Sequence, residues 1–467
     1  MRISLIGTGY VGLTTAVTFA ALRHEVICVD IDEKRIADLN RGCLPFYEPH
    51  MQEMFESVRS LLRFTTSYES AVPCADVVFI TVGTPAQPDG HPDLSYIQSA
   101  AQGIGRNLRR DFTVVVNKST VPIGSGNWVG SLLEESSVEN SGTSFTPRFA
   151  VASNPEFLRE GSALHDSFYP DRVVLGSDTP RALEALHDLY RPILEQTFTP
   201  PSFLPRPENL GAVPLLTTNL ASAELVKYAA NAFLALKISY INEIAAIAER
   251  VGADVTQIAK GIGLDSRIGS RFLQAGIGWG GSCFGKDTRA LLALGREYSL
   301  DLPIVTAARD VNYRQREKVL ERLQSALKIL KGRTVGILGL AFKAETDDLR
   351  DSPGLDIARR LAERRQGEGA RSSGPARCRA SARRLWAGLL RRCGGGGVPC
   401  GCVGAGHRLG GLPGSAVGGD RRRHAPQDNP GWAKFPGTEK TRNRRLSVLR
   451  HWKIAEIKAS RSEVRLA

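Results

Sequence analysis

The sequence has no apolar run that approaches the roughly 18 residues of a membrane-spanning helix. Its first residues, MRISLIGTGYVG, lack the layout of a signal peptide, because glycines interrupt the short apolar stretch at once. Cysteines are also scarce: only 8 occur among 467 residues, and the first four, Cys28, Cys43, Cys74 and Cys283, are widely scattered. That scatter fits a reducing compartment better than a disulfide framework. We therefore expect a soluble, cytoplasmic protein with no membrane partner.

The chain also lacks a general excess of basic charge, although its formal net charge is +13. Residues 365–467 carry 22 Lys and Arg against 6 Asp and Glu, whereas residues 1–364 carry 39 against 42. The bulk of the protein is therefore nearly neutral and has no basic footprint for a specific nucleic-acid partner.

Periodicity is absent from the last part of the chain, which is rich in Arg, Gly, Ala and Cys and holds 18 of the 47 glycines in residues 365–467. Such a composition cannot easily bury a core. We interpret this segment as an aberrant tail, either disordered or produced by a reading-frame shift near residue 364. Its arginines could bind nucleic acid nonspecifically. Zinc binding by Cys393, Cys400, Cys402 and His407 is the other alternative, but their spacing matches no standard ligand pair, and we predict no metal.

The remaining sequence predicts an α/β protein. A short apolar strand (1–6) precedes a glycine turn and a helical stretch, and EVICVD (25–30) reads as a second strand. Further apolar segments at 75–85, 112–122 and 149–157 alternate with helical stretches, which favours a Rossmann-type parallel sheet. Residues 220–250 contain no proline or glycine and predict one long, buried helix. Residues 331–343 begin a second, incomplete Rossmann-like unit, with DIARRLAER as its helix.

Gly7, Gly9 and Gly12 form the pattern G-x-G-x-x-G directly after a strand and at the start of a helix. The first glycine allows a tight turn, the second lets a pyrophosphate approach the backbone, and the third lets helix and strand pack closely. Asp30 ends the next strand, where an acid binds the ribose hydroxyls and favours NAD over NADP. The alternative is a purely structural turn. GILGLAFK in the second unit lacks the fingerprint, so it either binds another nucleotide or is structural only.

Several longer motifs resemble the UDP-glucose/GDP-mannose dehydrogenase family. They cover about residues 1–363 in the family's order: GTGYVGL, TVGTP, KSTVP, NPEFLREGSALHDSFYPDRVVLGS, AELVKYAANAFLALKISYINEIA, GGSCFGKDTRAL and GLAFKAETDDLRDSP. The GSALHDSFYPDRVVLGS version resembles the UDP-glucose branch more than the GDP-mannose branch. The resemblance implies that the C6 alcohol of a sugar nucleotide is oxidised to a carboxylate while two NAD molecules are reduced.

The resemblance also implies a division into parts. We expect an NAD-binding domain (1–205), a central helical dimerisation domain carrying the cysteine loop (206–325) and the start of a UDP-binding domain (326–364), before the aberrant tail (365–467). A homodimer or higher homo-oligomer is the expected assembly.

Cys283 stands alone in a run of glycines, GIGWGGSCFGKD (276–287). The resemblance implies that it is the nucleophile. Its thiolate would trap an aldehyde as a thiohemiacetal, a second hydride would leave to give a thioester, and water would then release the acid. We expect the glycines to leave room for the sugar to approach the sulfur. The alternative is a buried packing cysteine.

Lys227 and Asn231 are one helical turn apart and project from one face. The resemblance places both at the reacting C6 oxygen, where a lysine cation stabilises developing negative charge. A surface lysine and a helix cap are the alternatives. The resemblance also implies that Asp287 and Thr120 order a water for proton transfer. Alternatively, Asp287 caps a helix and Thr120 is a turn residue at a strand end.

Glu156 and Glu160 are also one turn apart. The resemblance implies that Glu160 contributes to thioester hydrolysis beside the nicotinamide, whereas Glu156 is interpreted by default as an exposed acid. The implied cofactor-binding residues are Gly7, Gly9, Tyr10, Val11, Gly12, Asp30, Thr84, Thr120, Glu160, Lys286 and Arg350, with Arg35 where a lysine is expected. The implied substrate-binding residues are Phe157, Leu158, Arg159, Glu160, Gly161, Lys227, Arg267 (donated across a dimer interface), Phe272, Leu273, Gln274, Ala275, Gly276, Gly280 and Lys343.

The sequence departs from the family at two positions of the cysteine loop, where Ile277 and Gly285 stand in place of prolines. Gly285 would loosen the loop beside the nucleophile. Two rival functions remain. One is a related enzyme that uses GDP-mannose or a UDP-N-acetylhexosamine, and the other is an inactive NAD-binding protein with a disrupted UDP-binding domain.

Overall fold

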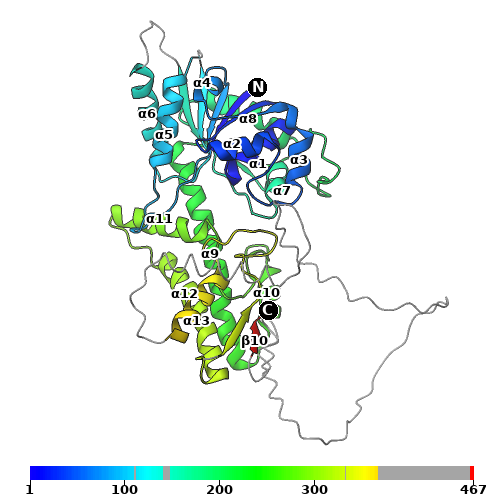
Figure 1. Cartoon of the computed structure of the whole chain (residues 1–467), viewed down its shortest axis with the longest axis vertical. Coiled ribbons are helices and arrows are strands. Elements are labelled where there is room, and N and C mark those ends of the chain that lie inside the picture. Colours follow the sequence, from blue (N-terminus) through cyan, green and yellow to red (C-terminus); the bar gives the residue numbers. More distant parts are fainter. Residues whose placement is uncertain (110–111, 140–147, 332, 367–462, 467) are drawn as a thin grey trace, which may run out of the picture.

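The computed structural model describes residues 1–109, 112–139, 148–331, 333–366 and 463–466. Most of the predicted aberrant tail lies outside these residues, and so do the four residues weighed as zinc ligands. Figure 1 shows a sheet with helices around it, joined through the long helix α9 to a second group of helices.

The larger group is built on an eight-stranded sheet in the order β3-β2-β1-β4-β5-β6-β7-β8. The first six positions have the 3-2-1-4-5-6 order of a dinucleotide-binding sheet, and all five pairings among them are parallel. The predicted α/β class and Rossmann-type sheet are therefore confirmed. The strands are β1 (Arg2–Ile6), β2 (Glu25–Val29), β3 (Leu62–Thr65), β4 (Val77–Ile80), β5 (Thr113–Asn117), β6 (Phe149–Ser153), β7 (Val173–Gly176) and β8 (Leu215–Thr218).

One edge of the sheet differs from the predicted parallel arrangement. β7 runs antiparallel to β6, with Ser153 opposite Gly176, and β8 pairs with β7 in parallel. The chain returns from β6 through only one short helix, so it reverses direction instead of making the long crossover that a parallel neighbour requires.

Helices cover both faces of the sheet because its central strands are apolar on both sides; all four residues of β4 and all five of β5 are buried. One apolar core gathers residues of α1, α3, α7 and α8, and a second gathers residues of α5 and α6. The elements of this group are α1 (Tyr10–Ala21), α2 (Glu33–Asn40), α3 (Met51–Ser57), η1 (Arg59–Leu61), α4 (Tyr68–Ala71), α5 (Ser95–Asn107), α6 (Ser125–Glu139), α7 (Ala163–Phe168) and α8 (Pro180–Leu194).

The long helix α9 spans Leu220–Val251, in agreement with the prediction for 220–250. The Asn219 side chain caps its start by accepting a hydrogen bond from the Ser222 amide, and Gly252 ends it with φ +75°. The prediction of a buried helix is correct for only one side of α9. One side packs on its neighbours, whereas the other exposes large apolar side chains: Leu225, Phe233, Tyr240, Ile247 and Val251.

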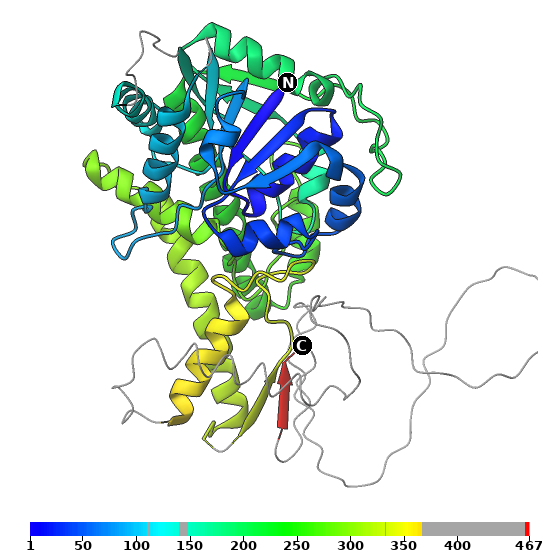
Figure 2. The same ribbon diagram turned by 45° about the horizontal axis from the view of Figure 1, so that its top comes forward.

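The second group packs on α9. It contains α10 (Val255–Gly263), α11 (Phe284–Glu297), α12 (Pro303–Leu327), β9 (Thr334–Ile337) and α13 (Pro353–Gln366). In Figure 2, α12 and α13 lie beside β9, which pairs in parallel with β10 (Glu463–Leu466). β9 and α13 are the strand and helix predicted for the incomplete second unit, but an extended loop joins them.

Candidate active site

The turn between β1 and α1 has the geometry of a dinucleotide-binding loop. Gly7 has φ +104°, a conformation that favours glycine. A Cβ on Gly12 would collide with the carbonyl oxygen of Gly7, so helix and strand approach each other only without a side chain there. A Cβ on Gly9 would meet no atom within 4 Å, which leaves the N-terminus of α1 open to a pyrophosphate. These residues therefore fit a dinucleotide.

Asp30 follows β2 beside this turn. Its carboxylate accepts hydrogen bonds from the Thr8 amide (2.8 Å), the Thr8 hydroxyl (2.7 Å) and the Arg35 guanidinium (3.0 Å). Burial raises the pKa of Asp30, but these hydrogen bonds and the Arg35 charge hold it below its ordinary value, so the carboxylate is ionised. Thr84 and Thr120 also meet, because the Thr84 hydroxyl donates to the Thr120 carbonyl oxygen at 2.9 Å.

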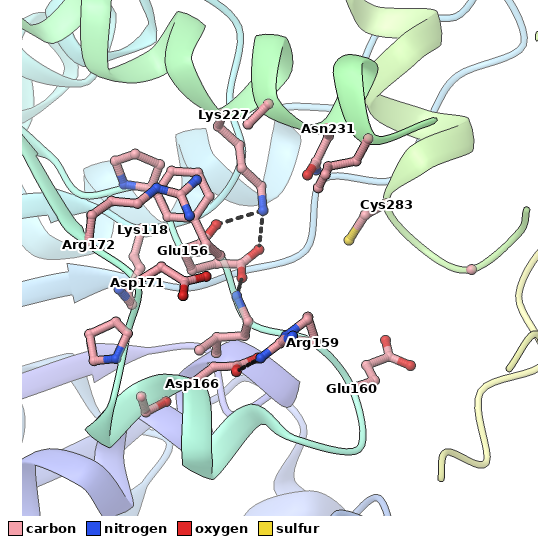
Figure 3. A pocket seen from close by; sticks show the side chains of 18 of the residues that line it. Lys118, Glu156, Arg159, Glu160, Asp166, Asp171, Arg172, Lys227, Asn231 and Cys283 are labelled. Atoms are coloured by element: carbon pink, nitrogen blue, oxygen red, sulfur yellow. Dashed lines mark hydrogen bonds and ion pairs between the residues drawn. The ribbon is translucent and has the colours of Figure 1, made fainter. Parts of the chain in front are cut away.

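A cavity of about 480 Å³ lies between the sheet, α9 and the cysteine loop. Figure 3 shows the side chains that face it, with Lys227 and Asn231 on α9, Cys283 opposite, and Glu160 on a loop below. Glu156 and Lys118 also line it, although sequence analysis assigned no role to either residue. The predicted site residues in its lining are Phe157, Leu158, Arg159, Glu160, Lys227, Asn231, Phe272, Gly280, Cys283 and Lys343.

Lys227 is buried and paired with a carboxylate. Its Nζ donates to Glu156 Oε1 at 2.9 Å and to the Glu156 carbonyl oxygen at 2.6 Å, and the two side chains are 4% and 8% exposed. Burial lowers the pKa of Lys227, but the nearby acidic groups, Glu156 first and then Cys283 and Asp287, together raise it above its ordinary value. Burial opposes ionisation of Glu156 too, yet Lys227 and the Leu158 amide hold its pKa below the ordinary range. The default interpretation of Glu156 as an exposed acid is therefore wrong, as is the alternative of a surface Lys227.

Asn231 connects α9 to α11. Its Nδ2 donates to Asp287 Oδ2 at 2.6 Å, and Lys286 Nζ donates to Asp287 Oδ1 at 2.6 Å. Asp287 is fully buried inside the first turn of α11, which begins at Phe284, so the alternative that it caps a helix is wrong. Asn231 is likewise in the middle of α9 and is no cap. The cavity lining includes Asn231 but neither Asp287 nor Thr120.

Cys283 is the N-cap residue of α11 and lines the cavity with its side chain half-buried. It does not pack in an apolar core. Burial raises the pKa of the thiol, whereas the Lys227 ammonium opposes that rise. The positive N-terminal end of a helix also stabilises a thiolate. The Lys227 ammonium and the N-terminus of α11 therefore both favour the thiolate form of Cys283.

Glu160 is held from three sides. Its carboxylate accepts hydrogen bonds from the hydroxyls of Thr346 (3.0 Å) and Ser282 (3.3 Å) and from the Arg350 guanidinium (3.3 Å). Burial, followed by the nearby charge of Asp348, raises the pKa of Glu160 to about 7. A carboxyl group with such a pKa can both accept and return a proton near neutral pH.

Glu48 is a functional residue that sequence reasoning missed. Its carboxylate accepts hydrogen bonds from the Tyr10 hydroxyl and from the amides of Gly161 (2.7 Å) and Ala163 (2.6 Å), and its side chain is 4% exposed. It therefore ties the loop that carries Glu160 to the first residue of α1, beside the dinucleotide turn. No local motif around FYEPH indicates this long-range contact.

Two glycines of the cysteine loop lie against a later segment of the chain. A Cβ on Gly280 would collide with the carbonyl oxygen of Asp351, and one on Gly281 would lie 2.8 Å from the Phe342 ring. Gly281 also donates its amide to the Arg350 carbonyl oxygen at 3.0 Å. The small residues thus let the segment 342–351 pack directly on the loop that carries Cys283.

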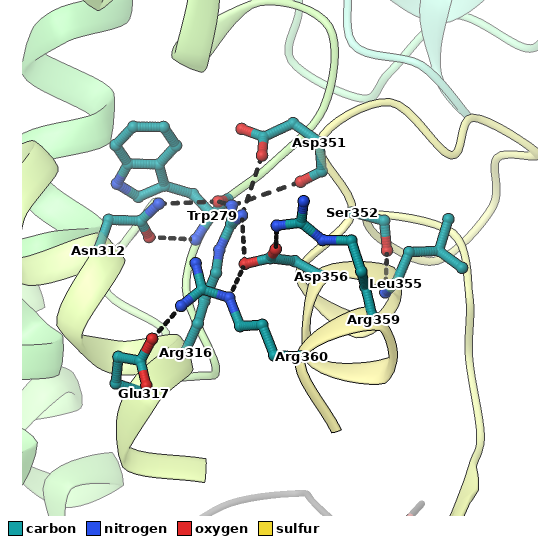
Figure 4. Close-up of polar contacts among 10 residues, drawn as sticks. All are labelled: Trp279, Asn312, Arg316, Glu317, Asp351, Ser352, Leu355, Asp356, Arg359 and Arg360. Atoms are coloured by element: carbon teal, nitrogen blue, oxygen red, sulfur yellow. Dashed lines mark hydrogen bonds and ion pairs between the residues drawn. The ribbon is translucent and has the colours of Figure 1, made fainter. Parts of the chain in front are cut away.

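Helix α12 fixes both segments, as Figure 4 shows. The Asn312 side chain bonds to the backbone amide (2.7 Å) and carbonyl oxygen (3.0 Å) of Trp279. The Arg316 guanidinium donates to that carbonyl oxygen at 2.9 Å and to Asp351 Oδ1 at 3.0 Å, and it lies 3.4 Å from Asp356 at the start of α13. The buried Arg316 therefore couples the position of the cysteine loop to that of the segment before α13.

We predict that Gly280→Ala lowers the free energy of unfolding by about 1–3 kcal/mol, because its methyl group would displace the backbone at Asp351. Gly276→Ala is the matched control in the same loop, since a Cβ there would meet no atom within 4 Å. Urea unfolding of both variants measures the difference. Equal stability of the two would contradict the packing described for Gly280.

Several predicted substrate residues lie away from the cavity. The Arg267 side chain is 87% exposed and pairs with Asp265 at 2.7 Å. Leu273 is buried in the apolar cluster under α9 and α10, with Ala275 packed against it. Ile277, in place of an expected proline, packs against the apolar cluster of α12 and α13. The predicted substrate-binding residues outside the cavity lining are Gly161, Arg267, Leu273, Gln274, Ala275 and Gly276.

The strand order, the open glycine turn and the cysteine beside a buried lysine together define a dinucleotide-dependent dehydrogenase. The chain belongs to the UDP-glucose/GDP-mannose dehydrogenase family. Three models of that family match it: the NAD binding domain over residues 1–194, the central domain over 221–314 and the UDP binding domain over 336–368. The protein is accordingly an NAD-dependent oxidoreductase.

Individual relatives agree with this assignment. The UDP-glucose 6-dehydrogenase TuaD of Bacillus subtilis is 44% identical over 358 residues, which are 76% of this chain and 72% of the relative. A solved UDP-glucose dehydrogenase from the archaeon Pyrobaculum islandicum is 42% identical, with a TM-score of 0.71 over 78% of this chain and 80% of that one. The structure of a UDP-D-ManNAc dehydrogenase from Pyrococcus horikoshii is 28% identical, with a TM-score of 0.66 over 78% and 81%.

In the part of the chain that the structure describes, no helix is long and apolar enough to cross a membrane. Within the same residues, no group of three or more His, Cys, Asp or Glu side chains is arranged to hold a metal ion.

Proposed function

We propose that this protein oxidises UDP-glucose to UDP-glucuronate with NAD, through a covalent intermediate on Cys283. The observation that carries the proposal is that Cys283 and the buried Lys227 line one cavity with Glu160. The loop that carries Glu160 also contacts the dinucleotide turn through Glu48 and Tyr10. The loop that carries Glu160 would therefore lie beside both Cys283 and the bound cofactor, so that a sugar carbon in the cavity could react with both.

The first step would remove a hydride from C6 together with the proton of the C6 hydroxyl, which would pass to a water ordered by Asp287 and Thr120. Bound NAD supplies the hydride acceptor for this oxidation and, as a second molecule, for the next one. Lys227 and Asn231 would bind the C6 oxygen, because they project from one face of α9 into the cavity. The ammonium of Lys227 stabilises negative charge on that oxygen, and its own charge is maintained by Glu156.

The second step is attack on the resulting aldehyde. The Cys283 thiolate forms a carbon–sulfur bond to C6, which gives a thiohemiacetal, and loss of a second hydride gives a thioester. Water then adds at C6, and the carbon–sulfur bond breaks to release the carboxylate and the thiol. Glu160 would accept the proton of that water, consistent with its raised pKa of about 7. Asp287 acts through Asn231, to which it is hydrogen-bonded.

The remaining predicted residues complete the proposal. The residues that would contact the sugar nucleotide are those that line the cavity: Phe157, Leu158, Arg159, Glu160, Phe272, Gly280 and Lys343. Lys286 and Arg350 would lie near NAD. The exposed apolar side of α9, with Phe233 61% and Val251 70% exposed, supports a homodimer in which Arg267 reaches the other copy's substrate. The four parts 1–205, 206–325, 326–364 and 365–467 are our proposed domain division.

The test is to assay the full chain with NAD and, in turn, UDP-glucose, GDP-mannose and a UDP-N-acetylhexosamine. We expect two NADH per UDP-glucuronate from UDP-glucose and far less NADH from the other two substrates. Turnover only with another sugar nucleotide would assign the rival substrate. NAD binding without any turnover would identify an inactive protein.

A further inference from the structure

Ser282 lies between two groups of the proposed mechanism. Its hydroxyl oxygen is 3.5 Å from Cys283 Sγ and 3.3 Å from Glu160 Oε1. The serine precedes α11, whereas Glu160 lies 122 residues earlier on the loop after β6. The loop that carries Ser282 is fixed through Trp279 by α12, and Glu160 is fixed from its other side by Thr346.

A hydroxyl group has one proton to donate and two lone pairs that accept. The Ser282 hydroxyl can therefore form hydrogen bonds to both Cys283 and Glu160 in only two ways. In the first, the thiol donates to Ser282 Oγ while Ser282 donates to the ionised Glu160. In the second, the protonated Glu160 donates to Ser282 Oγ while Ser282 donates to the thiolate. Both arrangements contain the same number of protons.

We propose that Ser282 is a proton relay between the thiol of Cys283 and the carboxylate of Glu160, a role that rests on the function proposed above. In the forward direction the S–H bond breaks, its proton binds Ser282 Oγ, and the original hydroxyl proton passes to Glu160 Oε1. No electron is gained or lost. The products are a thiolate ready to attack the aldehyde and a neutral carboxylic acid.

The relay runs backward when the thioester is hydrolysed. Before this step Glu160 releases the proton that it took from the thiol to solvent, so that its carboxylate is ionised again. Glu160 then accepts a proton from the attacking water and passes it through Ser282 to the departing sulfur. The proton that leaves the water is therefore the one that restores the thiol, and the site is ready for the next substrate. One carboxyl group and one hydroxyl group thus serve both ends of the covalent cycle.

The surrounding charges make such a relay useful. At the sulfur, burial raises the thiol pKa, and the acids Glu156 and Asp287 add to that rise, so a nearby proton acceptor is needed despite the opposing Lys227. The Arg350 guanidinium interacts electrostatically with both Glu160 and Cys283.

At the carboxylate, the charged neighbours are Asp348, Arg350 and Lys343, all on the segment before α13. Tyr10 on α1 is a neutral neighbour, because burial raises the pKa of its hydroxyl. Burial and Asp348 raise the pKa of Glu160 to about 7, which makes it a better proton acceptor than an ordinary carboxylate.

The test measures the alkylation rate of Cys283 by iodoacetamide against pH, without substrate, by mass spectrometry of the Cys283 peptide. Because only the thiolate reacts, coupling to Glu160 gives a profile with two steps, the lower one near the titration of Glu160. We expect Ser282→Ala to reduce the rate on the lower step about tenfold or more, since it removes a hydrogen bond to a charged group. Ser282→Thr keeps a hydroxyl and should retain the step.

Two controls keep the result interpretable. The exposed Cys43 in the same molecule should alkylate at an unchanged rate in every variant. Glu160→Gln should also abolish the lower step, and it leaves the glycine loop untouched if Ser282→Ala folds poorly. A lower step retained in either Ser282→Ala or Glu160→Gln would overturn the relay. Loss of UDP-glucuronate formation is a separate measurement, so failure of the proposed function would be recognised independently.

Discussion

Cys283→Ser should lose at least about a thousandfold of UDP-glucuronate formation, because removal of a covalent nucleophile typically costs that much or more. The serine hydroxyl occupies nearly the same space at the start of α11, so the fold should remain. Its much higher pKa leaves almost no oxyanion to attack an aldehyde. NADH release and UDP-glucuronate are measured together, which also shows whether the first oxidation survives.

The matched control is Cys43→Ser, since Cys43 is an exposed free cysteine outside the cavity lining. It should leave the rate unchanged. If Cys283→Ser formed UDP-glucuronate at the wild-type rate, covalent catalysis by this residue would be refuted.

Lys227→Met should both inactivate the enzyme and destabilise it. The variant leaves the Glu156 carboxylate, 8% exposed, without its ammonium partner, and breaking a buried ion pair costs about 3–5 kcal/mol. Loss of the charge at the C6 oxygen should lower kcat by about a hundredfold or more. Urea unfolding and NADH release measure the two effects. The double variant Lys227→Met/Glu156→Gln should recover most of the stability and none of the activity, whereas equal instability of the double variant would contradict the pairing.

The difference in the free energy of unfolding between the wild type and Lys227→Met should depend on pH in one direction. In the wild type the pKa of Glu156 lies below its ordinary value of 4.5, so its stabilising contribution is complete above that value and is lost as pH falls through the lowered one. In Lys227→Met the pKa of Glu156 would instead be raised by burial. The cost of burying the unpaired, ionised Glu156 carboxylate is then present above the raised pKa and is lost as pH falls and the carboxylate is protonated. The stability gap between the two proteins should therefore narrow from pH 7 toward acid.

Local patterns in the sequence were sufficient for much of the fold and part of the site. The glycine fingerprint predicted the turn after β1, and the unbroken run of helix formers predicted α9 almost to its last residue. The four-residue spacing of Lys227 and Asn231 correctly placed both on the face that lines the cavity. In each case the signal lies within one continuous stretch of the sequence.

The missed features depend on contacts between distant segments. Glu156 looks like an ordinary surface acid until α9 brings Lys227 across 71 residues to pair with it. Glu48 meets the Gly161 amide across 113 residues, and Ser282 meets Glu160 across 122. No periodicity or spacing rule encodes such pairs. The exposed apolar side of α9 was missed for a related reason, because composition reveals apolar residues without showing which of them face a neighbour.

The direct packing of segment 342–351 on the cysteine loop also constrains how this family can diverge. A larger residue at position 280 or 281 is compatible only with a chain whose later segment has moved away or changed its shape. Homologous sequences should therefore show correlated substitutions between positions 280–281 and positions 342 and 351. A lineage that lost the later segment would be released from that restriction at position 280, whereas the φ of +89° at Gly281 would still favour glycine there.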